Sequence, residues 1–266
     1  MPTYLDRILD TTVDRVKSEM RQRPFDELER EARSAPPVRN FTKAIKQPGM
    51  SLVAEFKRRS PSKGQIRADR HPAGTADAYQ VGGARAMSVL TEPRFFDGSM
   101  EDLQIARASC SLPVLRKDFM IHPYQVVQSR AGGADAILLI VAALPDPGLF
   151  SELADAAREY GMAALIEVHD PRELDAAFDI GPELIGVNQR SLLTFEVDVT
   201  LARRLRREIP RQVGMVAESG ITSRAQVEEL EEAGVDAILV GETLMRADDP
   251  SKAAAELLGG ASRLIR

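Results

Sequence analysis

The chain has 266 residues, of which 44% are hydrophobic and 28% are charged, and its formal net charge is −5. This composition is typical of a globular protein with a large core, and the acidic balance argues against a nucleic-acid-binding protein, which usually carries a basic surplus. The single cysteine, Cys110, excludes an intramolecular disulfide and favours a reducing compartment.

The N-terminal part, residues 1–48, is predicted to be a helical extension. Its first apolar residues recur at helical spacing and form a stripe that must pack on something: Leu5, Ile8, Leu9, Val13 and Val16. A second, more polar helix is predicted over residues 22–33, ended by Pro36-Pro37. Charged residues interrupt residues 1–20, as they would not in a signal peptide, and the longest apolar run, 136–144, is too short to span a membrane. We therefore expect a cytoplasmic protein without a membrane partner.

After Gly49, short apolar runs alternate with amphipathic segments. The runs are residues 52–56, 86–90, 113–115, 136–141, 163–168, 184–187, 214–217 and 237–240. Continuous apolar strands separated by helices indicate a parallel sheet covered by those helices. Eight such units favour a closed (β/α)₈ TIM barrel over residues 49–266, in one domain with the extension, and a doubly wound sheet is the alternative.

Three glycines precede strands in a repeated pattern: Gly83, Gly133 and Gly234. Each is predicted to end a helix in the left-handed conformation just before the next strand. They mark the architecture and are not candidates for a functional site.

Charged side chains stand at the ends of the predicted strands, where an ordinary barrel strand would be apolar. If Val53 points into the barrel, the two-residue period of a strand makes Glu55 and Lys57 point inward too. The same inward direction is expected for charged and polar residues at the ends of later strands: Lys117, Glu167, Asn188, Arg190 and Glu218. One such charge is often a solvated loop residue. A set converging at the C-terminal face of a barrel is typical of an acid–base site for an anionic substrate.

Two glycine-containing segments, after the seventh and eighth predicted strands, favour a phosphate site. Gly220 and Gly241 would let backbone N–H groups approach the anion, and a helix predicted to begin near Glu242 would add its positive end. The Glu242 side chain should then point outward, because a carboxylate repels phosphate. A glycine that ends a strand can also be a simple turn residue.

The remaining candidates for chemistry favour ordinary structural roles. The histidines lack the spacing of a zinc site and are interpreted as surface or supporting residues: His71, His122 and His169. Cys110 is interpreted as a small core residue. No metal site is predicted.

The chain resembles the indole-3-glycerol phosphate synthase family over essentially its whole length. The most specific motif is LVAEFKRRSPSKG at residues 52–64. Others follow in the family's order: SVLTE at 88–92, FFDGS at 95–99, LRKDF at 115–119, IEVH at 166–169, GVNQR at 186–190 and ESGI at 218–221. Two departures are mild: Gln189 stands where the family often has Asn, and Glu242 where a small residue is common.

The resemblance implies ring closure and decarboxylation of 1-(2-carboxyphenylamino)-1-deoxyribulose 5-phosphate without a metal or organic cofactor. It implies that Lys117 is the general acid, that Glu167 is a general base and that Lys57 assists as an acid. Its other implied catalytic residues orient these groups and the substrate: Glu55, Asn188 and Glu218. Its implied substrate-binding residues are Ser60, Pro61, Phe96, Phe119, Arg190 and Ser219, with Gly220, Gly241 and Glu242 at the phosphate.

Other functions stay open on the residues alone. A different phosphate-binding barrel enzyme is possible, such as one like phosphoribosylanthranilate isomerase, or an aldolase that uses Lys57 or Lys117 as a Schiff-base nucleophile. A barrel that only binds phosphorylated metabolites is the non-enzymatic alternative.

Overall fold

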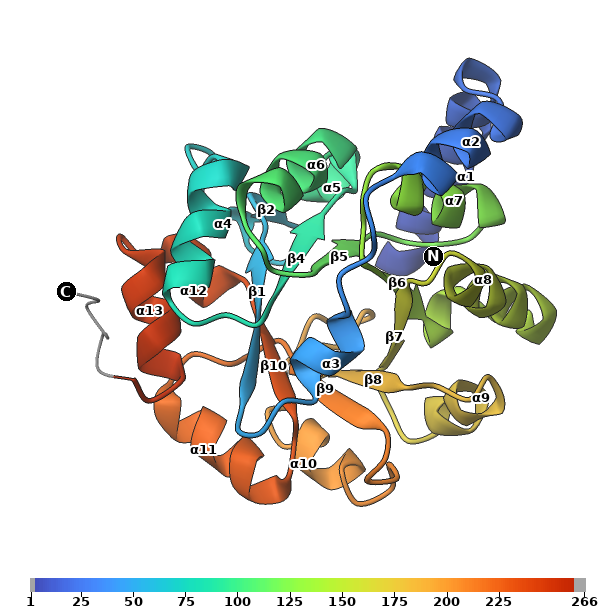
Figure 1. Ribbon diagram of the computed structural model, residues 1–266. Coiled ribbons are helices and arrows are strands. Elements are labelled where there is room, and N and C mark those ends of the chain that lie inside the picture. The colour runs from blue at the N-terminus through green and yellow to red at the C-terminus, as the bar shows by residue number, and fades with distance from the viewer. Residues whose placement is uncertain (1–2, 261–266) are drawn as a thin grey trace.

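The computed structural model describes residues 3–260 and contains a closed barrel of parallel strands (Figure 1). Around the barrel the order is β1-β10-β9-β8-β7-β6-β5-β4, and β1 pairs with both β10 and β4. The strands are β1 Ser51–Phe56, β4 Ala86–Leu90, β5 Val114–Lys117, β6 Ala136–Ile140, β7 Ala163–Val168, β8 Leu184–Asn188, β9 Gly214–Glu218 and β10 Ala237–Val240. The predicted (β/α)₈ fold is confirmed. The last residue of each predicted strand lies within two residues of the last residue of the observed strand.

Helices surround the barrel, as the amphipathic segments between the strands predict. They are α4 Pro72–Val81, α6 Met100–Ser109, α7 Pro123–Ala131, α8 Pro147–Glu159, α9 Glu173–Asp179, α10 Leu201–Leu205, α11 Arg224–Ala233 and α13 Pro250–Leu257. Shorter pieces are α5 Pro93–Phe96, the 3₁₀ helix η1 Val141–Ala143 and α12 Glu242–Arg246. Gly83, Gly133 and Gly234 have φ of 89°, 85° and 82°, so their predicted left-handed conformation is confirmed.

Alternate strand residues fill the inside of the barrel. Val53, Leu115, Leu165 and Val216 belong to one buried cluster together with residues of the other strands. Because side chains two positions apart share a strand face, Glu55, Lys117, Glu167 and Glu218 project into the barrel at its C-terminal end.

Helix α1, Tyr4–Gln22, begins at a capping box between Thr3 and Asp6, and its buried residues differ from the predicted stripe. They are Leu5, Ile8, Thr12 and Val16, whereas Val13 is 37% exposed. The reason is rotation about the helix axis: the spacing of the buried residues keeps them on one face, and Val13 lies about 100° away from Thr12. Thr12 can be buried because its hydroxyl donates a hydrogen bond to the Ile8 carbonyl at 2.9 Å.

Two further helices connect α1 to the barrel. Helix α2, Phe25–Ser34, packs on α7, where Leu28 and Ala32 meet Tyr124 and Val127 (Figure 1). Helix α3, Phe41–Ile45, was not predicted; its Phe41 belongs to the buried cluster inside the barrel. Since Ser51 at the start of β1 donates to α3 carbonyls, α3 closes the N-terminal end of the barrel.

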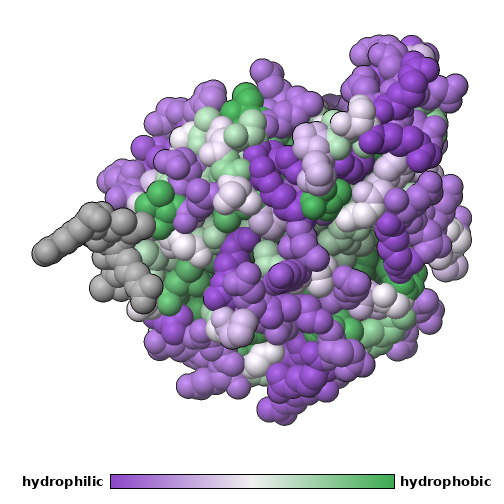
Figure 2. Space-filling model, viewed as in Figure 1, coloured by the Kyte–Doolittle hydropathy of each residue, from purple (hydrophilic) through white to green (hydrophobic). Residues whose placement is uncertain are grey.

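The loop after β1 forms a small hairpin, β2 Arg59–Ser60 with β3 Gly64–Gln65. The face of the molecule drawn in Figure 2 is mainly hydrophilic, and hydrophobic residues appear on it as small separate groups. None of the helices within residues 3–260 is long and apolar enough to cross a membrane.

Candidate active site

A cavity of about 630 Å³ opens at the C-terminal ends of the strands, opposite α3. It is lined by every residue that the sequence predicts for the site: Glu55, Lys57, Ser60, Pro61, Phe96, Lys117, Phe119, Glu167, Asn188, Arg190, Glu218, Ser219, Gly220, Gly241 and Glu242. These residues come from loops and strand ends that are far apart in sequence, and the closed barrel brings them together.

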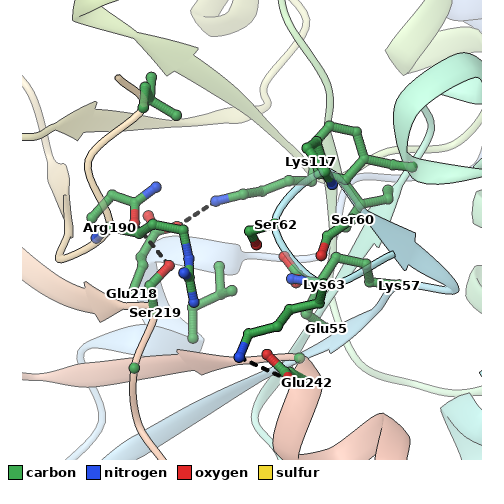
Figure 3. Close-up of a pocket in the computed structure, with 18 of the residues that line it drawn as sticks. Glu55, Lys57, Ser60, Ser62, Lys63, Lys117, Arg190, Glu218, Ser219 and Glu242 are labelled. Atoms are coloured by element: carbon green, nitrogen blue, oxygen red, sulfur yellow. Dashed lines mark hydrogen bonds and ion pairs between the residues drawn. The ribbon is translucent and has the colours of Figure 1, made fainter. Parts of the chain in front are cut away.

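Lys117 at the end of β5 lines this cavity (Figure 3). Its Nζ atom donates to Glu167 Oε2 at 3.0 Å and also contacts Glu218 Oε2. Both carboxylates are buried, with side chains only 2% exposed, while the lysine side chain is 13% exposed. One ammonium group therefore bridges two carboxylates from β7 and β9.

The three groups shift one another's pKa values. Burial favours a neutral Lys117, but the charges of Glu167 and Glu218 outweigh it and raise the lysine pKa. Burial likewise opposes ionisation of Glu167, yet Lys117 and His169 lower the pKa of that carboxyl. Burial, together with the repulsion from Glu167, raises the pKa of Glu218. Near neutral pH the geometry thus supplies a charged acid beside an ionised carboxylate.

Glu167 has two further partners besides Lys117. Its Oε1 atom accepts a hydrogen bond from Asn188 Nδ2 at 3.2 Å and lies 3.2 Å from His169 Nε2. Asn188 is itself held in place, because its Oδ1 accepts from the Arg190 backbone at 3.1 Å and from the Ser219 hydroxyl at 2.8 Å. The Glu167 carboxylate is therefore fixed from three directions.

A second ion pair joins the end of β1 to the loop that follows it. Lys57 Nζ lies 2.5 Å from Glu55 Oε1, and Glu55 is buried while Lys57 is 20% exposed on its side chain. Gly241 packs against this carboxylate so closely that a Cβ atom at position 241 would collide with Glu55 Oε1. A larger residue after β10 would therefore have to displace the Glu55 carboxylate.

Buried ion pairs fix the chain on both sides of Lys117. Asp118 accepts from both Arg15 guanidinium nitrogens of α1, at 3.0 and 2.8 Å, and from Arg116 Nη2 at 2.9 Å. Thr91 Oγ1 donates to the same carboxylate at 2.7 Å. Burial alone would raise the pKa of Asp118, but the two arginines lower it.

The candidate phosphate end lies at the loops after β9 and β10. Ser219 and Gly220 have φ of 68° and 76°, so both adopt the left-handed conformation. The Glu242 side chain, which was expected to point outward, lies at the cavity rim and is about one-third exposed. Its Oε1 lies 3.1 Å from Arg246 Nε and 3.8 Å from Lys63 Nζ, so two cations offset its charge (Figure 3).

Aromatic and apolar side chains line another part of the cavity. The rings of Phe96 and Phe119, from the loops after β4 and β5, are 6.1 Å apart between centroids and inclined by 39°. Arg190 Nη1 donates to the Phe195 carbonyl at 3.0 Å, which holds the loop after β8 against the cavity.

Sequence reasoning missed several cavity residues. Tyr4, Leu5 and Ile8 of α1 line the cavity, although none of them was named as a site residue from the sequence. Lys63 was part of the first motif but was not singled out, and the contact of His169 with Glu167 was not foreseen. The period of two residues could have found His169, since it stands two positions after Glu167.

The other histidines have structural roles. His71 and His122 accept hydrogen bonds from backbone N–H groups and cap the starts of α4 and α7. Cys110 is partly buried against the core. Within residues 3–260, no group of three or more His, Cys, Asp or Glu side chains is arranged to hold a metal ion.

Solved structures with low sequence identity share this barrel fold. (S)-3-O-geranylgeranylglyceryl phosphate synthase from Thermoplasma acidophilum superposes with a TM-score of 0.58 at 16% identity and covers 84% of this chain and 98% of its own. N-acetylmannosamine-6-phosphate 2-epimerase from Clostridium perfringens superposes with a TM-score of 0.62 at 14% identity, over 82% and 96% of the two chains. At these identities the likeness concerns the fold alone.

Sequence comparison is more specific. The family model of indole-3-glycerol phosphate synthase matches residues 5–257. Indole-3-glycerol phosphate synthase 2 of Streptomyces coelicolor is 51% identical over 86% of this chain and 88% of its own length. The synthase of Mycolicibacterium smegmatis is 46% identical over 94% and 93% of the two chains. The chain therefore belongs to the indole-3-glycerol phosphate synthase family.

Proposed function

We propose that this chain converts 1-(2-carboxyphenylamino)-1-deoxyribulose 5-phosphate to indole-3-glycerol phosphate, carbon dioxide and water, as a carboxy-lyase of tryptophan biosynthesis. The observation that carries the proposal is the Lys117 ammonium held between the buried carboxylates of Glu167 and Glu218. The single cysteine supports a reducing compartment, the cytoplasm, for this activity.

Lys117 is proposed as the general acid of ring closure. The aryl carbon that bears the carboxylate attacks the ketone carbon, and the ketone oxygen takes a proton as the new carbon–carbon bond forms. A charged lysine inside the cavity can donate that proton, and general acids of this kind contribute about 10²–10⁴-fold to rate. Carbon dioxide then leaves, and its bonding electrons return to the ring.

Glu167 is proposed as the general base of the dehydration that follows. The hydroxyl must take a proton from another acid before it departs as water, and Lys57 is proposed as that acid. Glu167 accepts the proton that the five-membered ring loses as the indole forms. Its ionised state and its fixed position support this role.

The remaining predicted residues are proposed to orient the substrate and these groups. Glu55 holds Lys57, Glu218 holds Lys117, and Asn188 holds Glu167. Phe96 and Phe119 would pack on the anthranilate ring, and Ser60 and Pro61 would shape the pocket around it. Arg190 would bind an anionic group, and Ser219 with the backbone at Gly220, Gly241 and Glu242 would bind the phosphate.

The charge state of Lys117 argues against an aldolase. Schiff-base formation needs a neutral amine nucleophile, and a lysine used in this way usually has a lowered pKa. The pKa of Lys117 is raised by its two carboxylates, although burial opposes this shift. We expect no covalent adduct when the protein is treated with borohydride in the presence of the substrate.

A turnover assay tests the proposed function. The purified chain is mixed with the carboxyphenylamino ribulose phosphate, and indole-type absorbance is followed. We expect the wild-type chain to form product and Glu167→Gln to lose most of that rate while still binding substrate. A wild-type chain that binds the substrate without turnover would support the alternative of a barrel that only binds phosphorylated metabolites.

A further inference from the structure

His169 stands between two carboxylates at the end of β7. Its Nε2 atom lies 3.2 Å from Glu167 Oε1, and its Nδ1 atom lies 3.4 Å from Glu173 Oε2. The same Glu173 oxygen accepts the backbone N–H of His169 at 2.7 Å, which fixes the ring at the start of α9. The histidine side chain is only 11% exposed, so both contacts are shielded from water.

This arrangement favours a proton on each ring nitrogen, because a carboxylate oxygen lies near both. A neutral imidazole has one N–H donor, whereas an ionised carboxylate offers only acceptors. With a carboxylate oxygen close to each ring nitrogen, the imidazolium is the form that directs an N–H group toward both carboxylates. The charged groups that face the ring are Glu167 of β7 and Glu173 of α9; the neighbouring Asp170 is paired with Arg172.

We propose that His169 is a positioning residue that clamps Glu167 and supplies it with a permanent positive charge throughout the reaction. The proposal rests on the proposed function, in which Glu167 is the base and Lys117 the acid. When Lys117 gives up its proton, Glu167 loses the charge of its closest cation. His169 takes no part in proton transfer, so its charge keeps Glu167 ionised until the dehydration step.

The pKa of His169 agrees with this role. Burial would lower it, but the hydrogen bonds and charges of Glu167 and Glu173 raise it to about 10. The ring is thus protonated over the range in which such an enzyme would work.

Kinetics of His169→Gln test the positioning role. Glutamine places a neutral N–H donor near the position of Nε2, so it keeps a polar donor beside Glu167 and removes the charge. In metal sites, losing the partner that orients a ligand costs about 10–100-fold. We expect kcat to fall by about tenfold or more at little change in KM.

The pH dependence separates this role from a merely structural one. Without the imidazolium the Glu167 carboxyl is easier to protonate, so on the acid limb of the pH profile kcat/KM should begin to fall at a higher pH than in the wild type. His122→Gln, which changes a histidine that caps α7, is the matched control and should leave the limb unchanged. A His169→Gln enzyme with wild-type kcat and a wild-type acid limb would overturn the proposal.

Nitrogen-15 NMR of the three histidine rings tests the charge without using activity. We expect the His169 signals, assigned by their loss in His169→Gln, to remain those of an imidazolium past pH 8, and Glu173→Gln to lower their midpoint. A ring that is neutral at pH 8 would overturn the proposal. The proposed function is tested by a different result: it fails if Glu167→Gln turns over like the wild type. The NMR result does not depend on turnover, so the two failures can be distinguished.

Discussion

At the scale of single residues, Glu242 explains how a carboxylate can stand beside a phosphate site. Arg246 and Lys63 flank it, so the local charge at the rim is not negative. Since Lys63 is 45% exposed and 3.8 Å from Glu242, it is free to turn toward an incoming anion.

Lys63→Ala should therefore raise KM about two- to fivefold, which matches the strength of an exposed ion pair, and should leave kcat nearly unchanged. Glu242→Gln is the matched variant, because the backbone and not the side chain of residue 242 is proposed to bind. It should keep KM or lower it. Steady-state kinetics of both variants test these expectations. A severalfold increase in KM for Glu242→Gln would show that the Glu242 carboxylate itself helps to bind the substrate.

His169 also makes the stability of the fold depend on pH. Its pKa in the folded chain is about 10, above its ordinary value of 6.5, because the bonds to Glu167 and Glu173 outweigh burial. A raised pKa means stabilisation that is complete below the unfolded value and is lost as the pH rises through the folded value. Urea unfolding of the wild type and His169→Gln should differ most at pH 6 and least at pH 10. A difference that is constant or grows with pH would refute the assignment.

At the scale of elements, α1 links the extension to the cavity. Its buried face reaches the cavity through Leu5 and Ile8, and its Arg15 holds Asp118 next to Lys117. The helix thus contributes both to packing and to the cavity wall.

Ile8→Ala should lower the free energy of unfolding by about 2 kcal/mol, the smallest loss usual for replacing a core isoleucine with alanine. Because Ile8 also lines the cavity, the substitution should raise KM. Val13→Ala, on the exposed face of the same helix, is the matched control and should change the unfolding free energy by less than about 0.5 kcal/mol. Denaturant melts and kinetics of both variants check this. Equal effects of the two substitutions would mean that α1 does not pack as described.

The two loop glycines should respond differently to substitution. Gly220→Ala strains a backbone with φ of 76° and meets Val197, so it should raise KM far more than it lowers kcat. Gly241→Ala would displace the Glu55 carboxylate that holds Lys57, and kcat should fall as well. Measured kcat and KM for both variants check the difference, and an unchanged KM in Gly220→Ala would place the phosphate elsewhere.

Most of the barrel could be predicted because each strand is a continuous apolar run between helix signals. The strand ends were predictable for the same reason, since Glu167 and Glu218 follow the two-residue period from Leu165 and Val216. Helix α3 and the β2–β3 hairpin were not predictable, because five- and two-residue elements carry too little periodicity. Val13 was misplaced because Thr12 is buried through its own hydrogen bond, which a hydrophobic pattern ignores.

At the scale of the whole molecule, the barrel is closed at one end by α3 and open at the other, where the charged residues gather. Contacts between elements distant in sequence determine the site: Lys117 meets Glu218 across the barrel, and Arg15 reaches Asp118. Such pairings follow from closure of the sheet. The inward direction of these side chains could be predicted from the strand period, but their partners could not.

The central claim is that Lys117 donates a proton, and kcat of Lys117→Arg tests it most directly. Arginine keeps the positive charge but does not deprotonate in proteins, so it is a poor acid. With substrate binding near normal, we expect kcat to fall about 10²–10⁴-fold, nearly as far as in Lys117→Ala. A Lys117→Arg enzyme that recovers most of the activity lost in Lys117→Ala would show that Lys117 acts only through its charge, and would contradict the account.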